Sequence, residues 1–145
     1  MNSRRRLFFA LAVLPLLACS AFHAQAQNRE LHQVRRIYVA TMGSGEAASH
    51  FREILQDQLR NVDFEVTDST DDADAVLTGE FSAESHDDKS FARATVTLKS
   101  RDEKRTLWSG DYVSQHRGQG NEDVVRTVAE NCAQHLKEDW DKAGD

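Results

Sequence analysis

Proline, cysteine and long apolar runs are all scarce in this 145-residue chain. Its one proline is Pro15, so the folded part of the chain is expected to contain no proline kink and no slow prolyl isomerisation. Its two cysteines are Cys19 and Cys132, and Cys19 lies in an amino-terminal segment that we expect to be removed or anchored. One remaining cysteine excludes an intrachain disulfide, so packing must stabilise the fold.

Basic residues are outnumbered as well. The chain has 18 lysines and arginines and 24 aspartates and glutamates, which gives a net charge of −6. Loss of residues 1–26 would remove three arginines and no acidic residue, leaving 15 basic residues and a net charge of −9. An acidic chain is repelled by nucleic acid and by anionic lipid, so neither is an expected partner.

The amino terminus has the pattern of an export signal. Arg4, Arg5 and Arg6 precede an apolar run over residues 7–18, which is twelve residues long. A membrane-spanning helix needs about 20 apolar residues, so this run indicates a signal peptide. The stretch at residues 3–8 also resembles a twin-arginine signal, which leaves the export route open. We therefore expect an exported, periplasmic protein.

Two processing sites compete within this signal. The triplet Ala24-Gln25-Ala26 is an A-x-A cleavage site and would make Gln27 the new amino terminus, with residues 1–26 as the signal. The run Leu16-Leu17-Ala18-Cys19 resembles a bacterial lipobox, which would acylate Cys19, limit the signal to residues 1–18 and give an outer-membrane lipoprotein. Contact with a membrane is expected only through such an anchor.

Beyond the signal, the periodicity of apolar residues predicts one domain. Residues 27–33 are polar and predict an extended leader, residues 34–141 form the domain, and residues 142–145 form a tail. Strands are expected over residues 34–41, 63–68, 75–84, 92–100 and 106–113. One helix is expected to begin after Ser44, its cap residue, and to end near Asn61. A second helix is expected over residues 121–140. The fold class is α/β: a two-layer sandwich, order β-α-β-β-β-β-α, in which two helices cover one face of a mixed five-stranded sheet.

The stretch "VATMGSGEAA" raises the question of a dinucleotide site. Gly43, Gly45 and Ala48 match G-x-G-x-x-A after a predicted strand. A dinucleotide fold needs continued alternation of strand and helix, which stops here after the second strand. Glu46 would also place a carboxylate where a pyrophosphate must sit. The pattern therefore predicts a strand-to-helix turn, and no cofactor.

No catalytic, cofactor-binding or metal-binding residue is predicted. The acidic stretches "DSTDDAD" and "ESHDDK" lack the glycine and closing glutamate of a calcium loop, and they are interpreted as solvated turns. The histidines are scattered, with His50 and His135 at surface positions of helices. Cys132 lies in the apolar stripe of the last helix and is interpreted as a buried, inert thiol.

Three short motifs resemble a group of bacterial envelope domains. They are Phe64-Glu65-Val66, the segment "ADAVLTG" over residues 73–79, and Leu107-Trp108-Ser109. The group includes the curli-secretion channel subunit, the penicillin-binding-protein activator lipoprotein and the amino-terminal domain of the Tol–Pal propeller protein. The resemblance implies a small envelope α/β domain, without the pore strands of the channel and without the propeller. The turn "RDEKR" lacks the glycine usual in that group.

These observations together predict a non-enzymatic exported module that binds an envelope protein. The candidate interaction face is the outward side of the strand over residues 92–100, namely Arg93, Thr95, Thr97 and Lys99, with the loop over residues 115–120 beside it. The alternative is a small-molecule carrier or hydrolase-like enzyme with a pocket at residues 43–46, where ligands gather in open α/β sheets.

Overall fold

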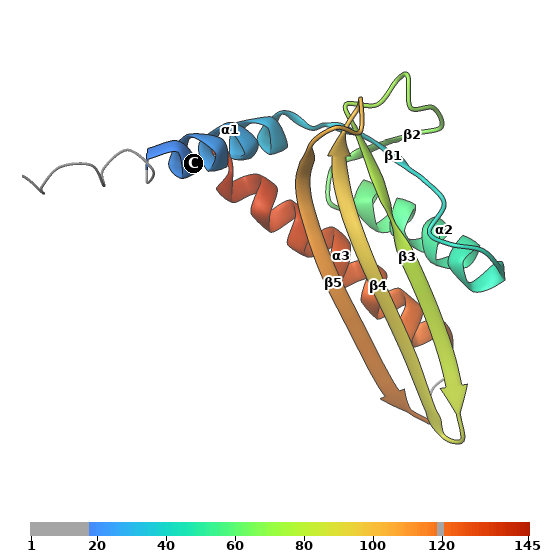
Figure 1. Cartoon of the computed structure of the whole chain (residues 1–145). Coiled ribbons are helices and arrows are strands. Elements are labelled where there is room, and N and C mark those ends of the chain that lie inside the picture. The colour runs from blue at the N-terminus through green and yellow to red at the C-terminus, as the bar shows by residue number, and fades with distance from the viewer. Residues whose placement is uncertain (1–17, 119–120) are drawn as a thin grey trace, which may run out of the picture.

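The computed structural model describes residues 18–118 and 121–145, so the first 17 residues of the predicted export signal lie outside the described part (Figure 1). The elements, in chain order, are α1 (Ala18–Gln33), β1 (Arg36–Val39), α2 (Glu46–Asn61), β2 (Glu65–Thr67), β3 (Ala75–His86), β4 (Lys89–Ser100), β5 (Thr106–Arg117) and α3 (Asn121–Lys142). Within the described residues, no helix is both long and apolar enough to cross a membrane.

The five strands form one mixed sheet in the order β2-β1-β3-β4-β5. β1 runs parallel to both of its neighbours, with Ile37 opposite Val66 on one side and Ala75 on the other. β3, β4 and β5 follow as an antiparallel meander. Figure 1 shows α2 and α3 on the same face of this sheet. The predicted α/β class, with two helices on one face of a mixed five-stranded sheet, is confirmed; α1 is an additional helix.

The core lies between the sheet and these two helices. Phe51, Leu55 and Leu59 recur every four residues on α2, and all three are fully buried. Val96 and Leu98 alternate along β4 and point into the same layer, where both are fully buried. The periodicities of helix and strand thus converge on one apolar layer, which is why the fold needs no cross-link.

The "VATMGSGEAA" stretch is the predicted strand-to-helix turn. Gly43 and Gly45 have φ angles of 118° and 105°, a region that favours glycine. The prediction that Ser44 caps the helix is wrong: Gly45 is the cap residue of α2, and the helix start has no side-chain cap hydrogen bond. The chain enters the helix one residue later than expected, so the Ser44 hydroxyl precedes the capping position.

The extended leader predicted for residues 27–33 is also wrong, because these residues form the end of α1. Most residues of the segment, namely its glutamines, arginine, glutamate and leucine, are good helix formers, and Leu31 is buried in the core with 4% of its surface exposed. The backbone N–H of Val34 bonds to the carbonyl of Leu31, which ends the helix. β1 is therefore shorter than the predicted strand over residues 34–41.

The three meander strands are longer than predicted. β3 continues to His86, β4 begins at Lys89, and β5 continues to Arg117. Polar residues at this far end join the sheet through backbone pairing. Their sequence lacks the alternation of apolar and polar residues that predicts a strand. The hairpin turns need left-handed residues, and Asp87 and Glu103 take that conformation, with φ angles of 53° and 57°. The turn "RDEKR" thus uses a glutamate where the resembling group has glycine.

Candidate functional site

The face of the sheet opposite α2 and α3 is the first candidate surface. We call the outward side chains of β3, β4 and β5 the uncovered face. The four predicted contact residues form one row on its middle strand: Arg93 and Thr95 are exposed, whereas Thr97 and Lys99 are half-buried. Their role in binding stays a prediction. Within the predicted contact loop, residues 115–117 belong to β5, and residues 119–120 lie outside the described part.

Two apolar side chains on the uncovered face were missed from the sequence. Val113 lies opposite Arg93 and is 66% exposed, and Phe91 lies two residues earlier on β4 and is 38% exposed. They line a hollow of about 380 Å³ together with Ser82, Glu84 and other residues at the far end of the meander. Val113 ends the predicted strand over residues 106–113, so its period-two alternation could have placed this residue on the outward side; Phe91 lies one residue before the predicted strand over residues 92–100.

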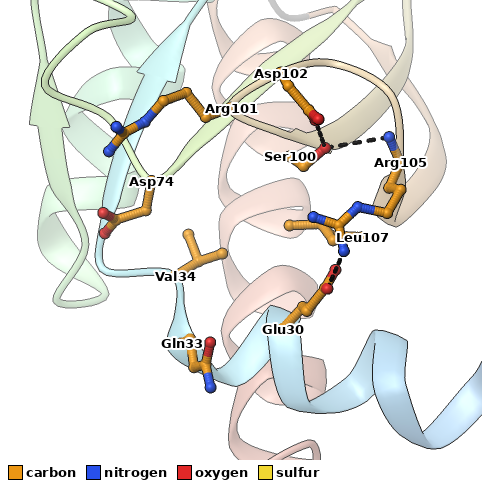
Figure 2. Close-up of a pocket in the computed structure, with 9 residues that line it drawn as sticks. All are labelled: Glu30, Gln33, Val34, Asp74, Ser100, Arg101, Asp102, Arg105 and Leu107. Atoms are coloured by element: carbon orange, nitrogen blue, oxygen red, sulfur yellow. Dashed lines mark hydrogen bonds and ion pairs between the residues drawn. The ribbon is translucent and has the colours of Figure 1, made fainter.

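A second candidate is the α1 groove, a hollow of about 530 Å³ between the end of α1 and the β4–β5 turn. Figure 2 shows its lining: Glu30, Gln33, Val34, Asp74, Ser100, Arg101, Asp102, Arg105 and Leu107. An ion pair between Glu30 and Arg105 spans it. The Ser100 hydroxyl donates to the Asp102 carboxylate at 2.5 Å and accepts from the backbone N–H of Arg105 at 3.1 Å.

Asp74, on the same groove, anchors the start of β1. Its carboxylate accepts bonds from the backbone N–H groups of Arg35 and Arg36, at 3.1 and 2.9 Å, and from the Arg36 guanidinium at 2.9 Å. Partial burial raises the pKa of the Asp74 carboxyl, but these hydrogen bonds and the Arg36 charge outweigh burial and hold the pKa below its usual value. Arg101 donates from Nε to the carbonyl of Ala73 at 2.6 Å.

The charged side chains of the α1 groove are therefore engaged with the protein itself. The groove also lies at the amino ends of β1 and β3, whereas ligands of open α/β sheets gather at the carboxyl ends. Residues 43–46, where the alternative reading expected a pocket, lie at the opposite end of β1 and are all exposed. This geometry suits a structural joint between α1 and the sheet.

Trp140 completes that joint. Its indole Nε1 donates to the carbonyl of Val34 at 2.9 Å, and the His32 ring lies 4.4 Å from its ring. The Arg35 guanidinium and the Lys137 ammonium lie over the indole, at 4.1 and 4.6 Å from the ring centre. Figure 1 shows α1 beside the carboxyl end of α3, where these contacts occur.

A third surface, the β5–α3 groove, runs along the outer edge of the sheet. It has a volume of about 360 Å³, and its lining comes from residues 108–112 of β5 and from His135, Glu138, Asp139 and Lys142 of α3. The Trp108 indole donates to Asp139 at 3.0 Å, and Lys142 pairs with the same carboxylate at 3.2 Å. Glu138 is exposed beside it, whereas the Asp111 carboxylate accepts a hydrogen bond from the Thr95 hydroxyl at 2.6 Å and so lies on the uncovered face. The groove thus places carboxylates of α3 next to an edge strand.

The other residues singled out from the sequence have structural or surface positions. Cys132 is fully buried, as predicted, and burial raises the pKa of its thiol to about 12; its lack of reactivity stays a prediction. His50 and His135 are exposed. Among the described residues, no three His, Cys, Asp or Glu side chains stand close enough to hold a metal ion. Cys19 lies in the first turn of α1, and both processing sites stay predictions.

Known proteins resemble this chain in fold rather than in sequence. No family model matches it, and no curated protein does. The PelC dodecamer from Paraburkholderia phytofirmans matches with a TM-score of 0.61 at 15% identity, over 71% of this chain and 87% of PelC. A minor lipoprotein from Acinetobacter baumannii matches with a TM-score of 0.47 at 14% identity, over 72% of this chain and 90% of the other.

A third structure, lipoprotein GNA1162 from Neisseria meningitidis, matches with a TM-score of 0.47 at 13% identity, over 72% of this chain and 99% of the other. None of these names is that of the three groups that the sequence resembles, so that narrower assignment stays a prediction. At such low identity the likeness to PelC is one of architecture: this chain has the small α/β fold that PelC has.

Proposed function

We propose that this chain is a non-enzymatic module, exported to the bacterial envelope, that works by binding another protein. The observation that carries the proposal is the uncovered face, a twelve-residue-long meander with two exposed apolar side chains beside a row of basic and hydroxyl groups. Exposed apolar side chains rimmed by polar ones are typical of protein-binding surfaces. PelC, which shares the fold, was solved as a dodecamer, and this supports an assembly role.

Export is supported by the signal pattern at the amino terminus. The intact mass of the mature protein from its own host tests this part. A chain that begins at Gln27 supports a soluble periplasmic form, and an acylated chain that begins at Cys19 supports a lipoprotein. A full-length chain that retains Met1 contradicts export.

The binding part is tested by charge reversal on the uncovered face. We expect the double variant Arg93→Glu with Lys99→Glu to lose an envelope protein that co-purifies with the native chain after chemical cross-linking. The matched control is Arg60→Glu with Arg126→Glu, which reverses two exposed arginines on α2 and α3 and leaves the face intact. Equal recovery of the partner with both double variants contradicts the proposal.

The alternative, a carrier or enzyme with a pocket at residues 43–46, has a separate test. Thermal unfolding is followed with nucleotides, sugars and calcium added in turn. A ligand that binds the native state at 100 times its Kd stabilises it by about 2.7 kcal/mol, which shifts the melting temperature clearly. Such a shift, lost when Gly43 is replaced by alanine, would favour the alternative over a protein-binding role.

A further inference from the structure

The outer edge of β5 is the longest unpaired feature of the sheet. β5 lies at one end of the strand order and has twelve residues, whereas β2 at the other end has three. α1 reaches its first residue, where the Gln27 amide donates to the carbonyl of Thr106 at 2.8 Å. In the described part of the chain, no strand pairs with β5 beyond β4. Residues 109–117 thus present about 30 Å of open backbone.

This edge lacks most of the devices that keep edge strands apart. Residues 109–117 contain no proline and no lysine, and the one irregularity in pairing lies at the start of the strand, next to Lys99 and Thr106. The most exposed large apolar side chain of the described residues, Val113, stands in the middle of the edge. An added strand would cover part of it.

The β5–α3 groove shows where an added strand would lie. It runs beside residues 108–112, and Figure 1 shows the carboxyl-terminal half of α3 extending past β5 under this edge. Extended segments bind other proteins in this way, by adding to a sheet edge next to a helix. Glu138 lines the groove, and the Asp111 carboxylate, which accepts from the Thr95 hydroxyl at 2.6 Å, lies on the uncovered side of the same edge. This half of β5 therefore favours an incoming strand with basic residues.

β5 itself is such a strand, because its two halves differ in charge. Its first half carries Asp111 and lies beside Glu138 of α3, and its second half ends in His116 and Arg117. Two antiparallel copies of β5 therefore bring each basic end next to the acidic first half of the other copy. A two-fold axis through Val113 sets Val113 opposite its own copy, Asp111 opposite Gln115 and Ser109 opposite Arg117, with no like charges facing each other.

We propose that two copies of this chain pair through the outer edges of β5, antiparallel and centred on Val113, to form one continuous ten-stranded sheet. The inference rests on the proposed protein-binding function and names one partner for it, a second copy. Asp111 lies diagonally across from the second copy's Arg117, within reach of that long side chain. Main-chain hydrogen bonds supply the attraction, and the charge pattern sets the register.

Disulfide trapping of the processed full chain tests the geometry. We expect Val113→Cys to form a disulfide-linked dimer under mild oxidation, at least tenfold faster than the control Glu80→Cys. Glu80 is exposed on the uncovered face but lies on β3, two strands away from the edge. The native Cys132 is buried, so disulfide cross-linking through it should be slow. Faster trapping of Glu80→Cys would indicate face-to-face packing and overturn edge pairing.

Charge reversal tests the register in solution, with sedimentation velocity over a range of protein concentrations as the readout. We expect Asp111→Lys to raise the Kd of the dimer about tenfold, and the double variant Asp111→Lys with Arg117→Glu to restore it to within about threefold. A native chain that stays monomeric at millimolar concentration overturns the inference. In that case, loss of the co-purifying envelope protein with Arg93→Glu and Lys99→Glu would still support the proposed function.

Discussion

The docking of α1 onto the domain leads to a quantitative prediction. Leu31 lies on α1 with 4% of its surface exposed and belongs to the core cluster. Full burial of a leucine side chain contributes about 1.5–3 kcal/mol, and its truncation in a core costs about 2–5 kcal/mol. Because α1 lies at the margin of the core, where neighbours can collapse into the space, we expect Leu31→Ala to lower the free energy of unfolding by about 2–3 kcal/mol.

Urea unfolding followed by circular dichroism measures this loss. With a slope of about 1–2 kcal/mol per molar urea for a domain of this size, the midpoint should fall by about 1–3 M. The matched control is Gln33→Ala, two residues along the same helix and exposed, which should change the free energy by less than about 0.5 kcal/mol. If Leu31→Ala unfolds at the same urea concentration as the native chain, α1 does not stabilise the domain and the reasoning fails.

Three further predictions concern the interior and the α1 groove. Cys132 should react with a thiol reagent only after unfolding, since burial raises its pKa to about 12; rapid modification of the native protein would contradict this. Asp74→Asn should lower stability at pH 7 by about 1–2 kcal/mol. The folded-state pKa of Asp74 is depressed, so its contribution is complete above the unfolded value and is lost as the pH falls through the folded one. The difference in urea midpoint between the two proteins should therefore be smaller at pH 2.5 than at pH 7. Gly79→Ala should lower the free energy of unfolding by about 1–3 kcal/mol in the same assay, because an added Cβ would lie 2.2 Å from the backbone oxygen of Thr95. An unchanged urea midpoint would contradict this, since it would mean that the β4 backbone moves away without loss of stability.

The predictions that held rest on local periodicity. The four-residue spacing of Phe51, Leu55 and Leu59 can be satisfied only by a helix with one buried side, and the alternation around Val96 only by a strand with one buried face. Gly43 and Gly45 needed no tertiary information, because the positive φ angles of that turn are available at little cost to glycine. The same reasoning predicted a buried Cys132.

The predictions that failed depended on partners distant in sequence. The sequence of residues 27–33 is polar and predicts no helix, yet Leu31 is buried in the core and the His32 ring packs against Trp140, which is 108 residues away in sequence. The residues that extend β3, β4 and β5 beyond the predicted strands are polar apart from Phe91, so backbone pairing rather than side-chain pattern extends these strands.

Local pattern therefore determined the elements, the turn and the buried layer of this protein, because each of these depends on the properties of residues a few positions apart. Tertiary structure alone decided that α1 belongs to the domain, that Val113 stands on an open edge, and that a groove runs between α3 and the first half of β5. Those features arise from contacts between segments far apart in the chain. Hydrophobic periodicity cannot predict such contacts, because it depends only on residues that are close in sequence.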